Sequence, residues 1–288
     1  MINRTAPTGL APGRWQKLAI NALKALANPA KAVKQILRRL PGLPVSLKLE
    51  LDLYERPAYA FGIARAALEA KALGIESIVV VELGVASGRG LLAMEQIAGD
   101  ISRATGVKIC PVGFDTGRGL PPPTDYRDLP YLYRGGFYPM DSDALRRHIS
   151  TAELVIGDVR ETVPDFLRGD RPPLGFVAVD LDYYSSTRDA LQLFTGPAES
   201  YLPRVLVYLD DIANATALQT RFTGELLAIE EFNHEHEHMK IDRVHGLAWK
   251  RPLPAAWNDQ MFTWHRFDHP AYGRPVVAEA EGYVGALT

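Results

Sequence analysis

The sequence is poor in cysteine, in long apolar runs and in net charge, and each shortage excludes a class of protein. Its one cysteine, Cys110, leaves no internal disulfide and fits a reducing compartment. No run of about eighteen apolar residues occurs, and the N-terminus lacks the apolar core of a signal peptide. The formal net charge of −2 carries no basic signature of nucleic-acid binding. We therefore expect a soluble cytoplasmic protein that does not bind nucleic acid.

Acidic residues are absent from the beginning of the chain up to Glu50, and this sets the N-terminal part apart. Apolar residues recur there at helical spacing between Ile20 and Leu40, with a break near Pro29 and a basic polar face. We expect residues 1–48 to form a basic helical arm and linker, and residues 49–288 the main domain. The arm is expected to pack on the body or on a second copy of a homo-oligomer. The alternative is contact with an anionic membrane.

From about residue 57 onward, apolar strand-like segments alternate with helix-like segments, and 47% of the chain is hydrophobic. This alternation predicts an α/β fold with a doubly wound, mostly parallel sheet. Strands are expected at 77–84, 108–115, 152–158, 175–182, 204–211 and 261–268. Helices are expected at 58–74, 88–105, 142–150, 161–169, 186–194 and 224–236.

Every predicted strand except the last runs into an acidic residue. These acids are Glu82, Asp115, Asp158, the pair Asp180 and Asp182, and the pair Asp210 and Asp211. In such sheets a ligand lies over the carboxyl ends of the strands, so the acids are expected to line one crevice. Carboxylates held close together repel one another unless a cation compensates them. The pattern predicts a divalent cation there, and capping or ion pairing is the alternative explanation.

The loop after the first strand, "VELGVASGRG", contains glycines that let the backbone pass close to a ligand. The spacing of Gly84 and Gly88 differs from the Gly-x-Gly-x-x-Gly pattern of dinucleotide binders. Glu82 would repel a pyrophosphate at this position and attract a cationic or amine-bearing ligand. A nucleotide-like ligand is the leading interpretation, and tight packing is the alternative.

Two further acids follow strands and have the chemistry to bind a nucleoside. Asp115 can accept hydrogen bonds from ribose hydroxyls, and Asp158 can meet the exocyclic amine of adenine. Either residue could instead cap a helix.

The segments "ELGVASGRG", "GFDTGRGLPPP", "VDLDYYSSTRDAL" and "YLDD", in this order, resemble class I S-adenosylmethionine-dependent methyltransferases. The similarity covers about residues 55–215 and is greatest to the macrocin O-methyltransferase group, metal-dependent enzymes that methylate sugar hydroxyls. It implies a Rossmann-like methyltransferase fold and S-adenosylmethionine as cofactor. It also implies Mg²⁺ held by Asp180, Asp210 and Asp211. The cofactor-binding residues expected on this basis and from the loop are Glu82, Gly84, Ser87, Gly88, Asp115 and Asp158.

The chemistry expected of such a site is methyl transfer to a hydroxyl of a small molecule, a sugar or another natural product. A divalent cation bound to that oxygen lowers its pKa and fixes its position. Asp180 and Asp182 are the candidate catalytic residues. If the strand continues to Asp182, the two side chains share a face, and Asp182 serves as general base or further ligand.

Two other classes of function remain open. The first is a nicotinamide-dependent oxidoreductase on a Rossmann sheet, against which stand the glycine spacing, Glu82 and the absence of a Tyr-x-x-x-Lys couple. The second is a non-catalytic cofactor-binding scaffold.

An aromatic loop with Tyr126, Tyr131, Tyr133 and Phe137 follows the second strand and is a candidate substrate lid.

Overall fold

The computed structural model describes residues 29–213 and 219–276. The chain divides into two units, Met1–Leu43 and Pro44–Thr288. The smaller unit contains helix α2 (Pro29–Leu37), which begins at the proline where the sequence predicts a break. The part of the predicted arm before Pro29 lies outside the described residues.

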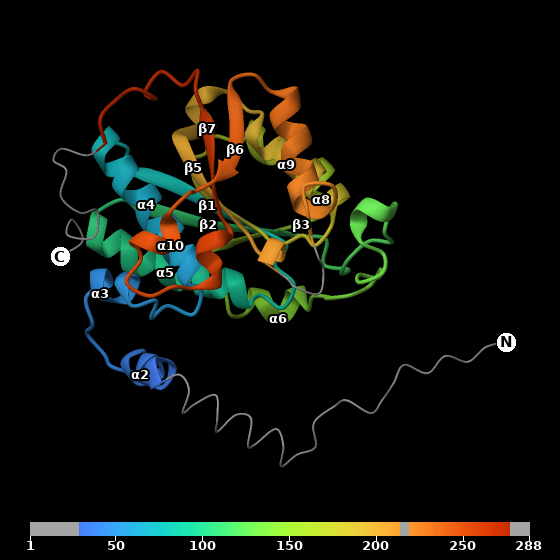
Figure 1. The fold of residues 1–288 in the computed structure, drawn as a ribbon. Coiled ribbons are helices and arrows are strands. Elements are labelled where there is room, and N and C mark those ends of the chain that lie inside the picture. The colour runs from blue at the N-terminus through green and yellow to red at the C-terminus, as the bar shows by residue number, and fades with distance from the viewer. Residues whose placement is uncertain (1–28, 214–218, 277–288) are drawn as a thin grey trace, which may run out of the picture. The chain divides into compact units, whose positions relative to one another are not determined.

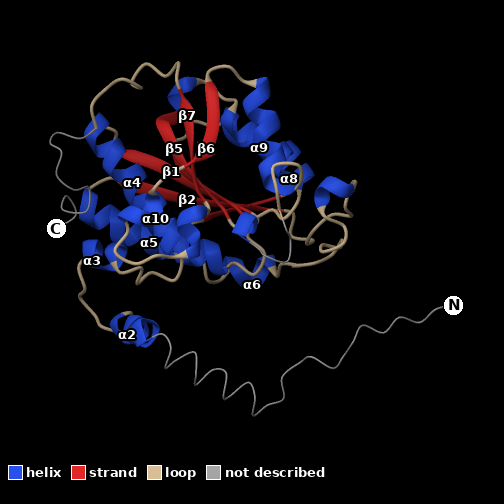
Figure 2. Cartoon of the chain, viewed as in Figure 1, coloured by secondary structure: helices blue, strands red, loops and turns tan. Residues whose placement is uncertain are grey.

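A seven-stranded sheet forms the centre of the larger unit (Figure 1, Figure 2). The strand order is β3-β2-β1-β4-β5-β7-β6, in which β1 to β5 are parallel and β7 and β6 are antiparallel. Their bounds are β1 Ser77–Leu83, β2 Lys108–Asp115, β3 Glu153–Ile156, β4 Leu174–Val179, β5 Tyr201–Leu209, β6 Met239–Arg243 and β7 Met261–Arg266. The prediction of a doubly wound, mostly parallel sheet is confirmed.

Helices cover both faces of the sheet because its central strands are apolar on both sides. On one face lie α4 (Pro57–Leu73) and α5 (Arg89–Thr105), whose core includes Tyr59 and Ile97. The other face is covered by α7 (Val159–Arg168), α8 (Tyr184–Ala190) and α9 (Gly224–Glu235). The shorter helices are α3 Val45–Glu50, α6 Ser142–Arg146 and α10 Leu247–Lys250.

Local sequence signals account for the C-terminal ends of the two long helices α4 and α5. Helix α4 has a proline at its first position and ends at Gly74, whose φ of 76° suits a left-handed cap. Helix α5 ends in the same way, at Gly106. None of the described helices has the length and apolar character that a bilayer crossing requires.

Candidate functional site

The parallel register brings the ends of the central strands to one edge. Leu83 of β1 pairs with Val179 of β4, and Val179 pairs with Leu209 of β5. The next residues therefore emerge side by side, and backbone hydrogen bonds hold them there. The amide of Asp180 donates to the carbonyl of Leu83 (2.9 Å), and the amide of Asp210 donates to that of Val179 (3.0 Å).

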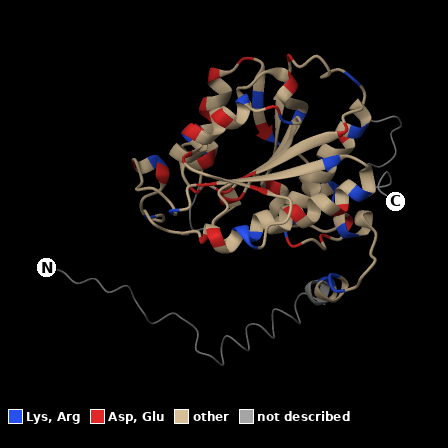
Figure 3. Cartoon of the chain, turned by 180° about the vertical axis from the view of Figure 1, so that it is seen from behind, with Lys and Arg blue, Asp and Glu red and all other residues tan. Residues whose placement is uncertain are grey.

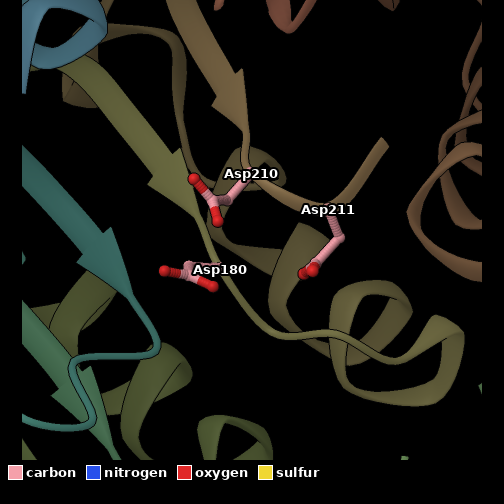
Figure 4. A group of neighbouring side chains, drawn as sticks. All are labelled: Asp180, Asp210 and Asp211. Carbon is pink, nitrogen blue, oxygen red and sulfur yellow. The ribbon is translucent and has the colours of Figure 1, made fainter. Parts of the chain in front are cut away.

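Three carboxylates meet at this edge, as the sequence predicts. One carboxylate oxygen from each of Asp180, Asp210 and Asp211 lies within 4.8 Å of the others (Figure 4). Acidic residues also occur on the outer helices (Figure 3). Burial, and then the charges of Asp210 and Asp211, raise the pKa of Asp180 well above its ordinary value. Burial also raises the pKa of Asp211 to about 6. Arg56 lies 3.9 Å from Oδ1 of Asp210 and compensates part of this negative charge. A bound cation would stabilise the remaining carboxylates.

Asp182 lies beside this cluster, but its backbone conformation differs from the expected one. Strand β4 ends at Val179, and Asp182 has a φ of 60°, so it does not share a strand face with Asp180. The chain turns there because the amide of Asp182 donates to Oδ2 of Asp211 (3.0 Å). Burial and the charge of Asp211 raise the pKa of Asp182 to about 7. The expectation of a continuing strand was wrong, although Asp182 still lies beside the cluster.

The glycine loop after β1 is held by Asp115 at the end of β2. Oδ2 of Asp115 accepts hydrogen bonds from the amides of Val85 (3.0 Å) and Ala86 (2.8 Å), and Oδ1 accepts one from Gly117 (2.7 Å). Gly84 has a φ of 86°, and a Cβ there would lie 1.9 Å from the carbonyl oxygen of Asp180. Only glycine allows the two strand ends to approach this closely.

Glu82 is buried on the α4 side of this loop, with 1% of its surface exposed. Its Oε1 accepts a hydrogen bond from the hydroxyl of Tyr59 (2.7 Å), and its Oε2 has no partner among the described residues. Burial raises the pKa of Glu82 to about 8. Gly90 leaves room for this carboxylate, because a Cβ at Gly90 would lie 1.7 Å from Oε1.

A cavity of about 680 Å³ opens over the strand ends. The predicted site residues that line it are Gly84, Asp115, Asp158, Asp180, Asp182, Asp210 and Asp211. The predicted residues that do not line it are Glu82, Ser87 and Gly88. Its wall also contains Tyr138, Arg127 and Ser185, which the sequence analysis did not single out. Arg127 and Tyr138 belong to the aromatic loop after β2, and Ser185 lies in the segment "VDLDYYSSTRDAL". The sequence marks these segments, but it does not show which of their side chains reach the cavity.

No protein-family model matches the chain, and no curated protein matches it. Among solved structures, CalS11, a calicheamicin methyltransferase, is 21% identical and superposes with a TM-score of 0.51. That match covers 90% of this chain and 95% of CalS11. The O-methyltransferase NovP is 16% identical, with a TM-score of 0.49 over 73% of this chain and 80% of NovP.

The chain has the fold of CalS11. The methyltransferase fold that the sequence resemblance implies is therefore confirmed. At this level of identity the likeness concerns the fold alone.

Asp158 has a structural role at the edge of the cavity. Its side chain caps α7 by accepting a hydrogen bond from the amide of Arg160 (2.9 Å), and the guanidinium of Arg160 pairs with it at 2.6 Å. These hydrogen bonds from Arg160 lower the pKa of Asp158. The carboxylate also faces the cavity, so its predicted contact with adenine stays a prediction.

The residues of the aromatic loop after β2 differ in how much they contribute to the site. Tyr133 is 3% exposed, and its hydroxyl donates to Oδ1 of Asp211 (3.0 Å). Tyr126 and Tyr131 are exposed, with 71% and 67% of their surfaces accessible. Tyr138 is half exposed and lines the cavity. This loop thus both supports the acidic cluster and forms part of the cavity wall.

Proposed function

We propose that the chain is an S-adenosylmethionine-dependent, Mg²⁺-assisted O-methyltransferase that acts on a hydroxylated small molecule, a sugar or another natural product. The observation that carries this proposal is the lining of one cavity by the Gly84 loop, Asp115 and three converging carboxylates. An electrophilic cofactor and a cation-bound hydroxyl need such neighbouring subsites.

The residues around Gly84 fit an S-adenosyl cofactor. The backbone passes the strand end without a side chain, and Asp115 holds the loop open by accepting the amides of Val85 and Ala86. Oδ1 of Asp115 accepts one amide hydrogen bond and keeps a lone pair for a ribose hydroxyl. When bound, this cofactor supplies an activated methyl group. Glu82 supports the loop from the side of α4 and does not contact the cofactor, because its carboxyl accepts a hydrogen bond from Tyr59.

The three aspartates fit a divalent cation such as Mg²⁺. They offer hard oxygen ligands from two neighbouring strand ends, and the cavity leaves coordination positions for water or substrate. When bound, the cation supplies a positive charge that lowers the pKa of a coordinated hydroxyl. The hydrogen bonds that Tyr133 and the amide of Asp182 donate to Asp211 fix the orientation of that carboxylate.

Asp182 is the group in this site that can accept the proton of the acceptor hydroxyl. It lines the cavity, and in the protein without metal, burial and the charge of Asp211 raise its pKa above the ordinary value, which favours proton binding there. Asp180 orients the acceptor as part of the cation site.

No observation in the described site favours a nicotinamide-dependent oxidoreductase. A scaffold without catalysis would bind the cofactor and leave every acceptor unmethylated.

Transfer of a labelled methyl group from S-adenosylmethionine to a panel of glycosides, nucleotide sugars and catechols tests the proposal. We expect transfer that needs a divalent cation. The double variant Asp210→Asn, Asp211→Asn should lose both transfer and the response to the cation. Full transfer by this variant would refute the mechanism, and cofactor binding without transfer to any acceptor would favour the scaffold.

We also propose that the basic arm docks on the acidic body of a second copy. Residues 1–48 contain nine lysines and arginines and no acid, so residues 49–288 hold 23 basic and 34 acidic residues. On α2 and just beyond it, Ile36 and Leu40 are exposed beside Arg38 and Arg39. We expect Arg38→Glu with Arg39→Glu to reduce the molar mass measured by light scattering. An unchanged mass would refute this docking, and binding of the chain to anionic vesicles would favour a membrane.

A further inference from the structure

Glu225 is a completely buried acid that the proposed chemistry leaves unused. It lies in the first turn of α9 and is 0% exposed. Its amide donates to Oε1 of Gln219 (3.2 Å), but neither carboxylate oxygen has a hydrogen-bond partner among the described residues. Buried carboxylates are normally paired, because an unpaired one destabilises the fold. Its retention here needs an explanation.

The groups that act on Glu225 are the carboxylates of the cluster. Burial raises its pKa well above the ordinary value, and the charges of Asp211, Asp180, Asp210 and Asp182 raise it further. Helix α9 packs against the turn Asp211–Ala213, which carries one of these acids. The partial positive charge of a helix N-terminus offsets only a small part of this repulsion.

Among the described residues, neither a basic side chain nor a ligand in the cavity compensates the charge of Glu225. The nearby Arg221 contacts Glu230 at 4.0 Å on the exposed side of the same helix. Glu225 is absent from the lining of the cavity, so cofactor and acceptor would not touch it. The basic side chain at the cluster, Arg56, lies 3.9 Å from Asp210 and forms no ion pair with Glu225 among the described residues. The ion that the neighbouring aspartates are suited to bind is the further source of positive charge.

We propose that Glu225 is a fourth carboxyl group of the cation site. This inference rests on the proposed function, because it assumes that Asp180, Asp210 and Asp211 bind a divalent cation. Glu225 stands outside the group of oxygens that lie within 4.8 Å of one another. Because it is fully buried and does not line the cavity, it would reach the ion by a rotation of its side chain.

A fourth carboxylate has a consequence for the choice of ion. Mg²⁺ retains several waters and is usually held by one or two carboxylates, whereas larger cations accept more protein oxygens. With Glu225 present, the site should bind Mn²⁺ and Ca²⁺ more tightly than three aspartates would. Without the ion, the same carboxyl should cost stability.

Direct Mn²⁺ binding to the full chain tests the proposal without any methyl transfer. Free Mn²⁺ is measured by electron paramagnetic resonance for the wild type, Glu225→Gln and the matched control Glu230→Gln. Glu230 lies on the same helix, and its side chain is 53% exposed. We expect Glu225→Gln to weaken Mn²⁺ binding by about tenfold, which is about 1.4 kcal/mol, and Glu230→Gln to leave it unchanged.

The variant Asp180→Asn distinguishes a failure of the role given to Glu225 from a failure of the proposed cation site. If Asp180→Asn loses Mn²⁺ binding while Glu225→Gln changes it by less than about threefold, Glu225 is not part of the site and the proposed cation site stands. If the wild type itself binds no Mn²⁺, both fail. Urea unfolding in the presence of a chelator verifies that Glu225→Gln is folded. Should it not fold, Glu225→Met replaces it in the same titration.

Discussion

Neutralising Asp180 should stabilise the metal-free protein, although it removes a residue from the proposed active site. The oxygens of Asp180, Asp210 and Asp211 lie within 4.8 Å of one another. At an effective dielectric constant near 20, two full charges at that distance repel by about 3.5 kcal/mol. Protonation relieves part of this repulsion, because burial and its neighbours raise the pKa of Asp180. We therefore expect Asp180→Asn to raise the free energy of unfolding by about 1–3 kcal/mol.

Urea unfolding at neutral pH, with a chelator and then with saturating Mg²⁺, measures this effect. An ion at a hundred times its dissociation constant stabilises the wild type by about 2.7 kcal/mol, and the variant should lose most of that gain. The order of stability should therefore reverse between the two conditions. Asp165→Asn is the control, because this aspartate is 70% exposed and pairs with Arg168 on the surface.

Two results would refute the reasoning. If Asp180→Asn were less stable than the wild type in chelator, the carboxylate would have a favourable partner and the cluster would not be repulsive. If Mg²⁺ stabilised both proteins equally, the ion would bind elsewhere.

Further predictions concern packing, a buried ion pair and pH. Gly90→Ala should destabilise the fold by about 1–3 kcal/mol in urea unfolding, because the new Cβ meets Oε1 of Glu82, and a neutral effect would contradict this packing. Arg251→Met should cost about 3–5 kcal/mol in the same assay, since it leaves the 3%-exposed carboxylate of Asp52 without its 2.6 Å partner; a loss below about 1 kcal/mol would show that the pair is not needed. The pKa of Asp182 is raised when folded, so without metal its contribution to stability falls as pH rises from about 4 to 7. Asp182→Asn should thus gain about 1–3 kcal/mol relative to the wild type between about pH 5 and 7, and a pH-independent difference would disprove the shift.

The fold was predictable because its central strands are apolar without alternation and each is followed by a helix pattern. The six residues of β4 carry that signal in full, and in β1 the apolar run is interrupted only at Ser77 and Glu82. Strand β6 was missed because "MKIDR" is half polar and lies at the sheet edge, where only one neighbour fixes it. Its pairing with β7 depends on tertiary contacts that the local sequence does not encode.

The acidic cluster was predictable for a geometric reason: parallel strands bring their carboxyl ends to one edge, so acids after β4 and β5 must meet. The sequence could not reveal the direction in which each acidic side chain points. Glu82 follows the same rule but faces Tyr59, away from the cavity. Asp182 turns at a positive φ because Asp211 binds its amide. Such orientations are set by partners distant in sequence.

Calorimetric titration with S-adenosylhomocysteine, in the presence of Mg²⁺, tests the central claim most directly. We predict saturable binding to one site per chain, strongly weakened by Asp115→Ala, and no binding of NAD⁺. Binding of NAD⁺ in place of S-adenosylhomocysteine, or S-adenosylhomocysteine binding that is indifferent to Asp115, would contradict it.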